Sequence, residues 1–184
     1  MTFTESKLKG EKDLNLPNKL TMMRIVLVPV TMALMLLGQS IPAGIVFAIA
    51  SITDFFDGYI ARKNNLVTSF GKIMDPLADK ILVFGALLCF IQNGTVNVWP
   101  PFIIIARELF VTCMRVVAVD KGKVIAASWW GKIKTNVQIF AVLFAIFFEN
   151  IYPTAATIVL WIAAGFTLLS WIAYIFENIE VFKD

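Results

Sequence analysis

The sequence predicts an all-α integral membrane protein with six transmembrane helices, and three observations lead to that fold class. The 184 residues are 59% hydrophobic and only 16% charged, whereas a soluble domain is nearer half apolar and about a quarter charged. The mean hydropathy is +0.79. Several apolar runs approach or exceed the ~20 residues that a helix needs to cross a bilayer. Little of the chain is left for a separate soluble domain.

The expected spanning helices are separated by short polar connections. They cover residues 20–37, 42–62, 71–92, 98–119, 128–148 and 154–176. The first ends at Gly38, and the third carries Pro76 near its entry, where a helix tolerates proline best. Residues 1–16 form a polar segment before the membrane domain of residues 17–184. This segment lacks the pattern of a cleavable signal peptide, and either an interfacial helix or a disordered tail fits it.

Among the connections between helices, basic residues occur only in alternate ones. They precede the first helix, flank the connection between the second and third, cluster between the fourth and fifth, and follow the sixth. The three other connections, GQSIP, QNGTVNV and ENIYP, contain no Lys or Arg. Because cytoplasmic loops carry an excess of Lys and Arg, both termini are expected in the cytoplasm.

Side chains near the predicted helix ends fall into two further groups. The aromatic ones are expected at the membrane interface, where Trp and Tyr are enriched. They are Trp99, Trp129, Trp130, Tyr152 and Tyr174. The acidic ones, Glu149, Glu177 and Glu180, are expected to be solvated.

Histidine is absent from the sequence, and the two cysteines, Cys89 and Cys113, both lie in apolar runs. Free, membrane-buried thiols are therefore expected rather than a disulfide. Histidine is the commonest neutral-pH base and the commonest metal ligand. Any acid–base or metal chemistry must therefore fall to Asp and Glu.

Four aspartates lie close together in this mostly apolar chain, namely Asp54, Asp57, Asp75 and Asp79. The first two are three residues apart and the last two are four apart, so each pair shares one face of a helix. Ionisable groups in membrane segments are costly and indicate function by default. The structural alternative is a set of solvated carboxylates paired with Arg62 and neighbouring lysines. A divalent cation neutralises them better, and oxygen ligands without His or Cys favour one or two magnesium or manganese ions.

The aspartates belong to a longer pattern, Asp-x2-Asp-Gly-x2-Ala-Arg-x8-Gly-x3-Asp-x3-Asp. It is filled here by Asp54, Asp57, Gly58, Ala61, Arg62, Gly71, Asp75 and Asp79. This pattern resembles the signature of the CDP-alcohol phosphotransferases, and every position matches at the family's spacing. The six-helix topology expected from hydropathy and charge agrees with that family's fold.

The resemblance implies a reaction and a set of roles. Members of this family move a substituted phosphoryl group from a CDP-alcohol to a second alcohol and release CMP. By the same resemblance Asp54, Asp57, Asp75 and Asp79 bind metal, and Asp79 is also the general base. The cytidine and diphosphate pocket would be lined by Asp54, Asp57, Gly58, Ala61, Arg62 and Gly71. A single direct attack is expected, since no Ser, Cys or His nucleophile is evident.

Within the family, the runs LPNKLTMMRI (16–25) and GKIKTNVQ (131–138) resemble the phosphatidylglycerophosphate synthases. This implies CDP-diacylglycerol as donor, sn-glycerol 3-phosphate as acceptor, and a homodimer. In the first run, Asn18, Thr21 and Arg24 would contact the nucleotide or diphosphate. The alternative for Asn18 is simple helix capping.

A phosphorylated acceptor needs an anion site, and Arg107, Arg115, Lys132 and Lys134 suit it. Arg107 and Arg115 are eight residues apart and are expected on similar faces of one helix, with Arg107 the deepest of the four. A pair between Arg107 and Glu108 is the alternative, but adjacent helical residues are expected to point apart. For the two lysines the alternative is the positive-inside bias.

Other functions stay open at this point. The acceptor could be serine, inositol phosphate or phosphatidylglycerol, although serine would leave the basic residues without a phosphate to bind. A cation transporter would need polar groups across the membrane midplane, and the outer halves of these helices offer almost none. A scaffold gives no reason for a cation site, and no nucleic acid partner is expected. The expected location is the plasma membrane, with the active site facing the cytoplasm.

Overall fold

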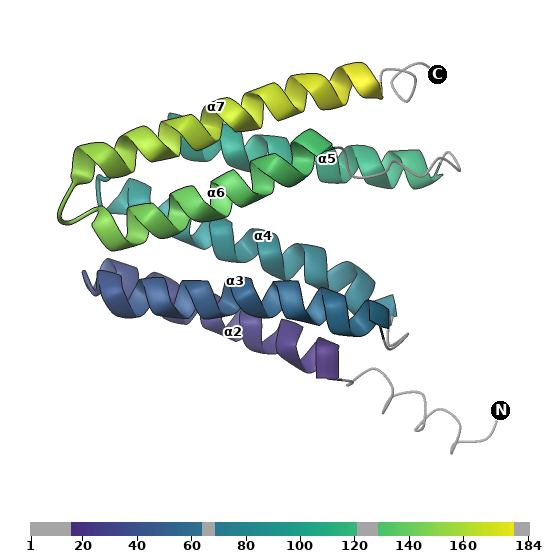
Figure 1. The fold of residues 1–184 in the computed structure, drawn as a ribbon, viewed down its shortest axis with the longest axis horizontal. Helices are drawn as coiled ribbons and strands as arrows, with labels where there is room; N and C mark the ends of the chain where they lie inside the picture. The colour runs from purple at the N-terminus through teal and green to yellow at the C-terminus, as the bar shows by residue number, and fades with distance from the viewer. Residues whose placement is uncertain (1–15, 64–68, 121–128, 179–184) are drawn as a thin grey trace. The chain divides into compact units, whose positions relative to one another are not determined.

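The computed structural model describes residues 16–63, 69–120 and 129–178, which form six α-helices and no strand (Figure 1). The helices are α2 (Leu16–Leu36), α3 (Ser40–Lys63), α4 (Ser69–Gln92), α5 (Trp99–Asp120), α6 (Trp129–Phe148) and α7 (Pro153–Glu177). The side chains of residues 16–18, 54–63, 69–73, 75, 76 and 120 lie outside the description. Each expected helix is present, so the all-α prediction is confirmed. The expected interfacial helix or tail falls in residues 1–16, and Leu16 alone among them is described.

The first compact unit, Met1–Ala86, contains α2, α3 and most of α4. In it α2 and α3 pack side by side (Figure 1). The buried face of α2 repeats every three or four residues, as a packed helix requires. It comprises Thr21, Arg24, Val28, Thr31 and Met35. Gly85 of α4 lets that helix approach α2, because a Cβ there would lie 2.9 Å from the sulfur of Met32.

Two helices end at a glycine with a left-handed backbone. Gly38 has φ 72° after α2, and Gly94 has φ 73° after α4. In both turns the following residue donates its N–H five residues back, from Gln39 to Leu34 at 2.9 Å and from Thr95 to Phe90 at 2.9 Å. This pattern satisfies the last helical carbonyls and favours glycine. The predicted stop of the first helix at Gly38 is confirmed.

The second compact unit, Leu87–Asp184, contains the end of α4 and all of α5, α6 and α7. Here α7 packs against both α5 and α6. The buried stripe of α7 is built mainly of small residues, which let neighbouring backbones approach closely. Its members are Ala156, Leu160, Ala163, Ala164, Thr167, Ser170 and Tyr174.

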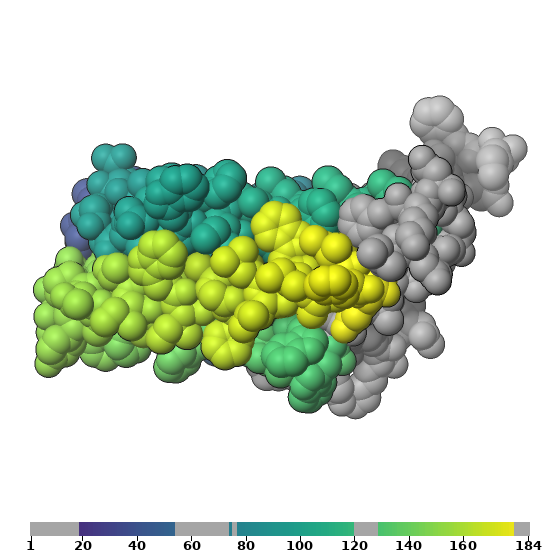
Figure 2. Space-filling model, turned by 90° about the horizontal axis from the view of Figure 1, so that it is seen from above, coloured from purple at the N-terminus to yellow at the C-terminus, as the bar shows by residue number. Residues whose placement is uncertain are grey.

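Much of the remaining surface is apolar, as a lipid-facing surface should be. Three of the described helices are long and apolar enough to cross a membrane, over Lys19–Leu36, Trp129–Phe148 and Pro153–Glu177. The α7 helix runs along the face seen in the space-filling view (Figure 2, light green to yellow). Its exposed side chains include Trp161, Phe166 and Leu169.

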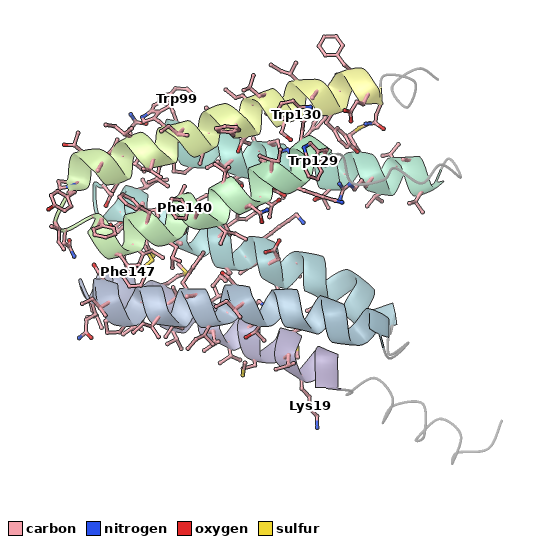
Figure 3. All side chains as sticks on the ribbon, in the orientation of Figure 1. Lys19, Trp99, Trp129, Trp130, Phe140 and Phe147 are labelled. Atoms are coloured by element: carbon pink, nitrogen blue, oxygen red, sulfur yellow. The ribbon has the colours of Figure 1, made fainter. Side chains whose placement is uncertain are left out.

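The expected interfacial aromatics behave in two ways. Trp99, Trp129, Trp130 and Tyr152 are all exposed near helix ends, and Figure 3 labels the three tryptophans. Tyr174 also lies near a helix end, but it differs from the other four because its side chain is only 1% exposed. It stands one turn after Ser170 on the inward stripe of α7, so it faces the other helices of its unit.

The expectation of a solvated Glu149 is wrong. Glu149 is 6% exposed, and its Oε2 accepts a 2.6 Å hydrogen bond from the hydroxyl of Thr95. Thr157 in turn donates to the carbonyl of Thr95 at 2.6 Å. These bonds tie the α4–α5 turn to the end of α6 and to the start of α7. Glu177 is exposed as expected, and Glu180 lies outside the described residues.

Both described cysteines are free, with Cys89 buried and Cys113 exposed. The prediction that they form no disulfide is therefore confirmed. The exposed Cys113 lies on the surface of α5, and its expected place within the membrane stays a prediction.

Candidate functional site

The aspartate motif lies on two helices of the first unit. The end of α3 carries Asp54, Asp57, Gly58, Ala61 and Arg62, and α4 carries Gly71, Asp75 and Asp79. Both segments are helical, which is the condition under which the aspartate spacing predicts a shared helix face for each pair. Of these side chains only that of Asp79 is described, and it is half-buried.

A metal site at the motif is not tested by the described side chains. No group of three or more His, Cys, Asp or Glu among them could hold a metal ion. Asp54, Asp57 and Asp75 lie outside that set. The assignment of a metal to the motif therefore stays a prediction.

Thr21 and Arg24 lie one turn apart on the inward face of α2, in the same unit as the aspartates. They are 0% and 1% exposed. An arginine this deeply buried in a membrane helix is kept for its interactions rather than for solubility. The side chain of Asn18 is not among those described, but α2 begins at Leu16, which places Asn18 inside the first turn rather than before it.

The second unit holds a buried polar cluster built from three helices. Arg107 and Glu108 come from α5, Lys134 from α6 and Ser170 from α7. Arg107 Nη2 donates a 2.8 Å hydrogen bond to Ser170 Oγ, and Arg107 Nη1 lies 3.3 Å from Glu108 Oε1. The same Glu108 oxygen accepts a hydrogen bond from Lys134 Nζ. The side chains of Arg107 and Lys134 are 6% and 1% exposed.

This geometry corrects the expectation that Arg107 and Glu108 point apart. Their Cα–Cβ bonds do diverge, as in any helix, but both side chains are long enough to turn back toward each other. Lys134 on the neighbouring helix supplies the reason, because it draws the Glu108 carboxylate inward. The two cations therefore meet at one carboxylate.

The other two basic candidates behave differently. Arg115 and Lys132 are both exposed. Eight residues of helix leave an offset of about 80°, so Arg115 does not share the inward face of Arg107. The structure thus divides the four predicted basic residues into a buried pair, Arg107 and Lys134, and an exposed pair.

The buried cluster can attract an anion. Arg107 and Lys134 place two cations at the single carboxylate of Glu108. Buried charges need counter-charges and charge-assisted hydrogen bonds. A phosphate offers both. Arginine in particular presents a planar fork that matches phosphate oxygens.

Sequence reasoning missed four members of this region: Glu108, Gln138, Ser170 and Tyr174. A signal was present on α7, where Ser170 and Tyr174 are polar residues one turn apart on a mostly apolar helix. On α6, Gln138 follows Lys134 by one turn in the same way. Polar residues repeated at that spacing in a membrane helix indicate a shared inward face.

Comparisons with known proteins agree with the motif. A family model described as CDP-alcohol phosphatidyltransferase matches residues 14–169. The chain is 44% identical over 188 residues to the CDP-diacylglycerol–glycerol-3-phosphate 3-phosphatidyltransferase of Bacillus subtilis, covering 92% of this chain and 97% of that protein. It is 41% identical over 170 residues to the Rickettsia prowazekii protein of the same name, covering 88% and 94%.

A further relative is the probable phosphatidylglycerophosphate synthase of Mycobacterium tuberculosis, at 38% identity over 168 residues, covering 88% of this chain and 80% of that protein. The family match spans all eight motif positions and helices α2 to α6, and it ends within α7. This protein therefore belongs to the CDP-alcohol phosphatidyltransferase family.

Proposed function

We propose that this protein transfers the phosphatidyl group of CDP-diacylglycerol to sn-glycerol 3-phosphate, giving phosphatidylglycerophosphate and CMP. The observation that carries the proposal is the run of relatives named for this activity, at about 40% identity over nearly the whole chain. The buried cations Arg107 and Lys134 support sn-glycerol 3-phosphate as the acceptor, since this molecule carries a phosphate that they could bind.

In this reaction the acceptor hydroxyl attacks the lipid-linked phosphorus of the donor. A phosphorus–oxygen bond forms as the bond to CMP breaks. Asp79, at the helix face it shares with Asp75, would take the hydroxyl proton as general base. A half-buried carboxylate on a rigid helix can be held ready for that proton.

The motif suits a hard divalent cation. Its donor set is all carboxylate oxygen, and no histidine exists in the chain to compete. Asp54, Asp57, Asp75 and Asp79 would hold two ions of magnesium or manganese. Bound there, such ions offset charge on the diphosphate and on the leaving CMP.

The remaining motif residues would serve the donor. We assign Gly58, Ala61, Arg62 and Gly71 to the cytidine diphosphate, together with Asn18, Thr21 and Arg24 of α2. Among the acceptor candidates, Arg107 and Lys134 would grip the phosphate directly, and the exposed Arg115 and Lys132 would attract it. Charge-assisted hydrogen bonds of this kind are the strong ones in anion binding.

The same proposal includes the membrane arrangement. All six helices would span the plasma membrane as one catalytic domain over residues 17–184, with both termini and the active site on the cytoplasmic side. The protein would act as a homodimer. Cysteine substitution and membrane-impermeant labelling at exposed Lys19 and Asn150 would test the sidedness. Labelling of both positions from the same side of intact cells would refute it.

CMP release tests the activity. Purified protein in detergent receives magnesium and CDP-diacylglycerol with one acceptor at a time: glycerol 3-phosphate, serine, inositol phosphate or phosphatidylglycerol. Release with glycerol 3-phosphate alone, abolished by excess chelator, is the expected result. Release with a different acceptor would overturn the acceptor assignment, and release that survives the chelator would overturn the metal assignment. Asp79→Asn should lose CMP release, whereas Glu177→Gln, the control at an exposed position, should keep it; the difference between them separates enzymatic release from background hydrolysis.

A further inference from the structure

The guanidinium of Arg107 is held by protein atoms at both of its terminal nitrogens. Nη2 donates a 2.8 Å hydrogen bond to Ser170 Oγ on α7, and Nη1 lies 3.3 Å from Glu108 Oε1 on α5. Arg107 and Ser170 are 5% and 1% exposed, so bulk water is kept from the bond between them. Among the described residues, the third nitrogen, Arg107 Nε, has no hydrogen-bond partner.

This unpaired nitrogen indicates where a ligand would bind. Buried polar atoms in native proteins are nearly always paired, so the exception at Nε needs an explanation. Arginine carries its five N–H donors in one rigid plane. When the terminal nitrogens of Arg107 are fixed, the direction of its Nε–H bond is fixed with them. An anion along that direction would meet a donor that is already oriented, and phosphate oxygens match the arginine fork.

Ser170 uses its hydroxyl across helices, unlike its neighbour on the same buried stripe. Thr167 Oγ1 donates at 2.7 Å to the carbonyl of Ala163, four residues earlier in α7. Ser and Thr side chains within helices often bind their own backbone in this way. Ser170 instead accepts a hydrogen bond from a residue 63 positions earlier in the chain. The backbone bond of Thr167 is repeated in other helices by Thr31, Thr112 and Thr135.

We propose that Ser170 is a positioning residue of the acceptor site. Its hydroxyl holds Arg107 so that the edge of the guanidinium that carries Nε faces the acceptor phosphate. A long side chain that is ordered before the ligand arrives loses less freedom on binding, so the affinity is higher. This inference rests on the proposed function, which supplies the phosphate. It adds a residue of α7 that neither the aspartate motif nor the basic residues identify.

The test removes the Ser170 hydroxyl and measures steady-state CMP release. Ser170→Ala should lower kcat/KM for sn-glycerol 3-phosphate about tenfold, the lower end for a hydrogen bond to a charged group, because Glu108 still holds Nη1. The loss should appear as a higher KM for this acceptor, with kcat and the KM for CDP-diacylglycerol unchanged. Ser170→Cys, with a weaker acceptor atom of similar size, should act in the same direction. Thr167→Val removes a hydroxyl from the same stripe and should change none of these values.

Two further variants separate positioning from packing. Because Ser170 acts through Arg107, Ser170→Ala should cause no further loss of kcat/KM in an Arg107→Met background. The slope of CMP release against acceptor concentration gives this value without saturation. Ser170→Thr keeps the hydroxyl and should keep kcat/KM for the acceptor near that of the unmodified enzyme, even where its added methyl group lowers the melting temperature.

Three results would overturn the inference while leaving the proposed function in place. They are an unchanged KM for sn-glycerol 3-phosphate in Ser170→Ala and Ser170→Cys, a loss that persists in full in the Arg107→Met background, and a loss in Ser170→Thr as large as that in Ser170→Ala. The last of these would mean that packing at position 170 matters rather than the hydroxyl. If the unmodified enzyme releases CMP with serine and not with sn-glycerol 3-phosphate, the proposed function itself fails, and this inference fails with it.

Discussion

Replacement of Glu108 by Gln should destabilise the protein strongly, because Glu108 is the shared counter-charge of two buried cations. Its Oε1 meets both Arg107 and Lys134, whose side chains are 6% and 1% exposed. Removing one partner of a buried ion pair costs about 3–5 kcal/mol, since it leaves the other charge uncompensated. At about 2–4 °C for each kcal/mol in a chain of this size, the melting temperature should fall by ~6–20 °C.

The assay is thermal unfolding in detergent, followed by intrinsic fluorescence. Glu177→Gln, at an exposed position of α7, is the matched control and should shift the melting temperature by no more than about 2 °C. Adding Lys134→Met to Glu108→Gln removes the surplus charge and should recover part of the loss. Saturating glycerol 3-phosphate should stabilise Glu108→Gln more than the unmodified protein, since its phosphate replaces the missing negative charge. A Glu108→Gln variant with the same melting temperature as the unmodified protein would refute the role of Glu108 as counter-charge.

Three other predictions concern single residues. Arg107→Met leaves Glu108 paired with Lys134 and should raise the KM for glycerol 3-phosphate about 10- to 150-fold, because a charge-assisted hydrogen bond is lost. Steady-state CMP release measures this change. A change confined to the KM for CDP-diacylglycerol would reassign Arg107 to the donor site. Asp79→Asn should lower kcat by about 10²- to 10⁴-fold without lowering the melting temperature, and kcat near that of the unmodified enzyme would remove its role as base. Burial raises the pKa of Glu149 above its ordinary value of 4.5, against opposing hydrogen bonds from Thr95 and Asn93. The folded chain therefore binds this proton more tightly than the unfolded chain does, so stability should rise as pH falls from neutral toward 4.5 and be lost as pH rises through the folded pKa. Glu149→Gln should remove that part of the dependence, and parallel curves of melting temperature against pH would contradict it.

The helices and the motif could be predicted from the sequence because local rules decide them. Apolar runs long enough to span a bilayer form helices in any membrane context. The spacing of Asp54 and Asp57 fixes a shared face once their segment is helical. Glycine at position 38 ends a helix for reasons contained in its own backbone. None of these inferences needs to know which helix is the neighbour.

The position of an individual polar side chain, in contrast, depends on which residues of a neighbouring helix or turn lie beside it. Glu149 lies at a helix end, where a carboxylate is usually solvated, but Thr95 meets it from 54 residues away in the chain. Glu108 turns toward Arg107 because Lys134, 26 residues later, draws its carboxylate inward. A rule about adjacent residues gives the direction of the Cα–Cβ bond and not the place where a long side chain ends.

Tyr174 shows how the sequence could have yielded more. A tyrosine near a helix end satisfies the interface rule, and that rule takes no account of which way the helix faces. The small residues of α7 show which side of the helix faces inward, since Ala156, Ala163 and Ser170 recur every seven residues along one stripe. Small residues mark the side on which helices approach one another in a membrane. Tyr174, one turn beyond Ser170 on that stripe, must then point inward, and an inward hydroxyl in a membrane protein requires a partner. The register of small residues therefore predicts that Tyr174 faces the other helices rather than lipid.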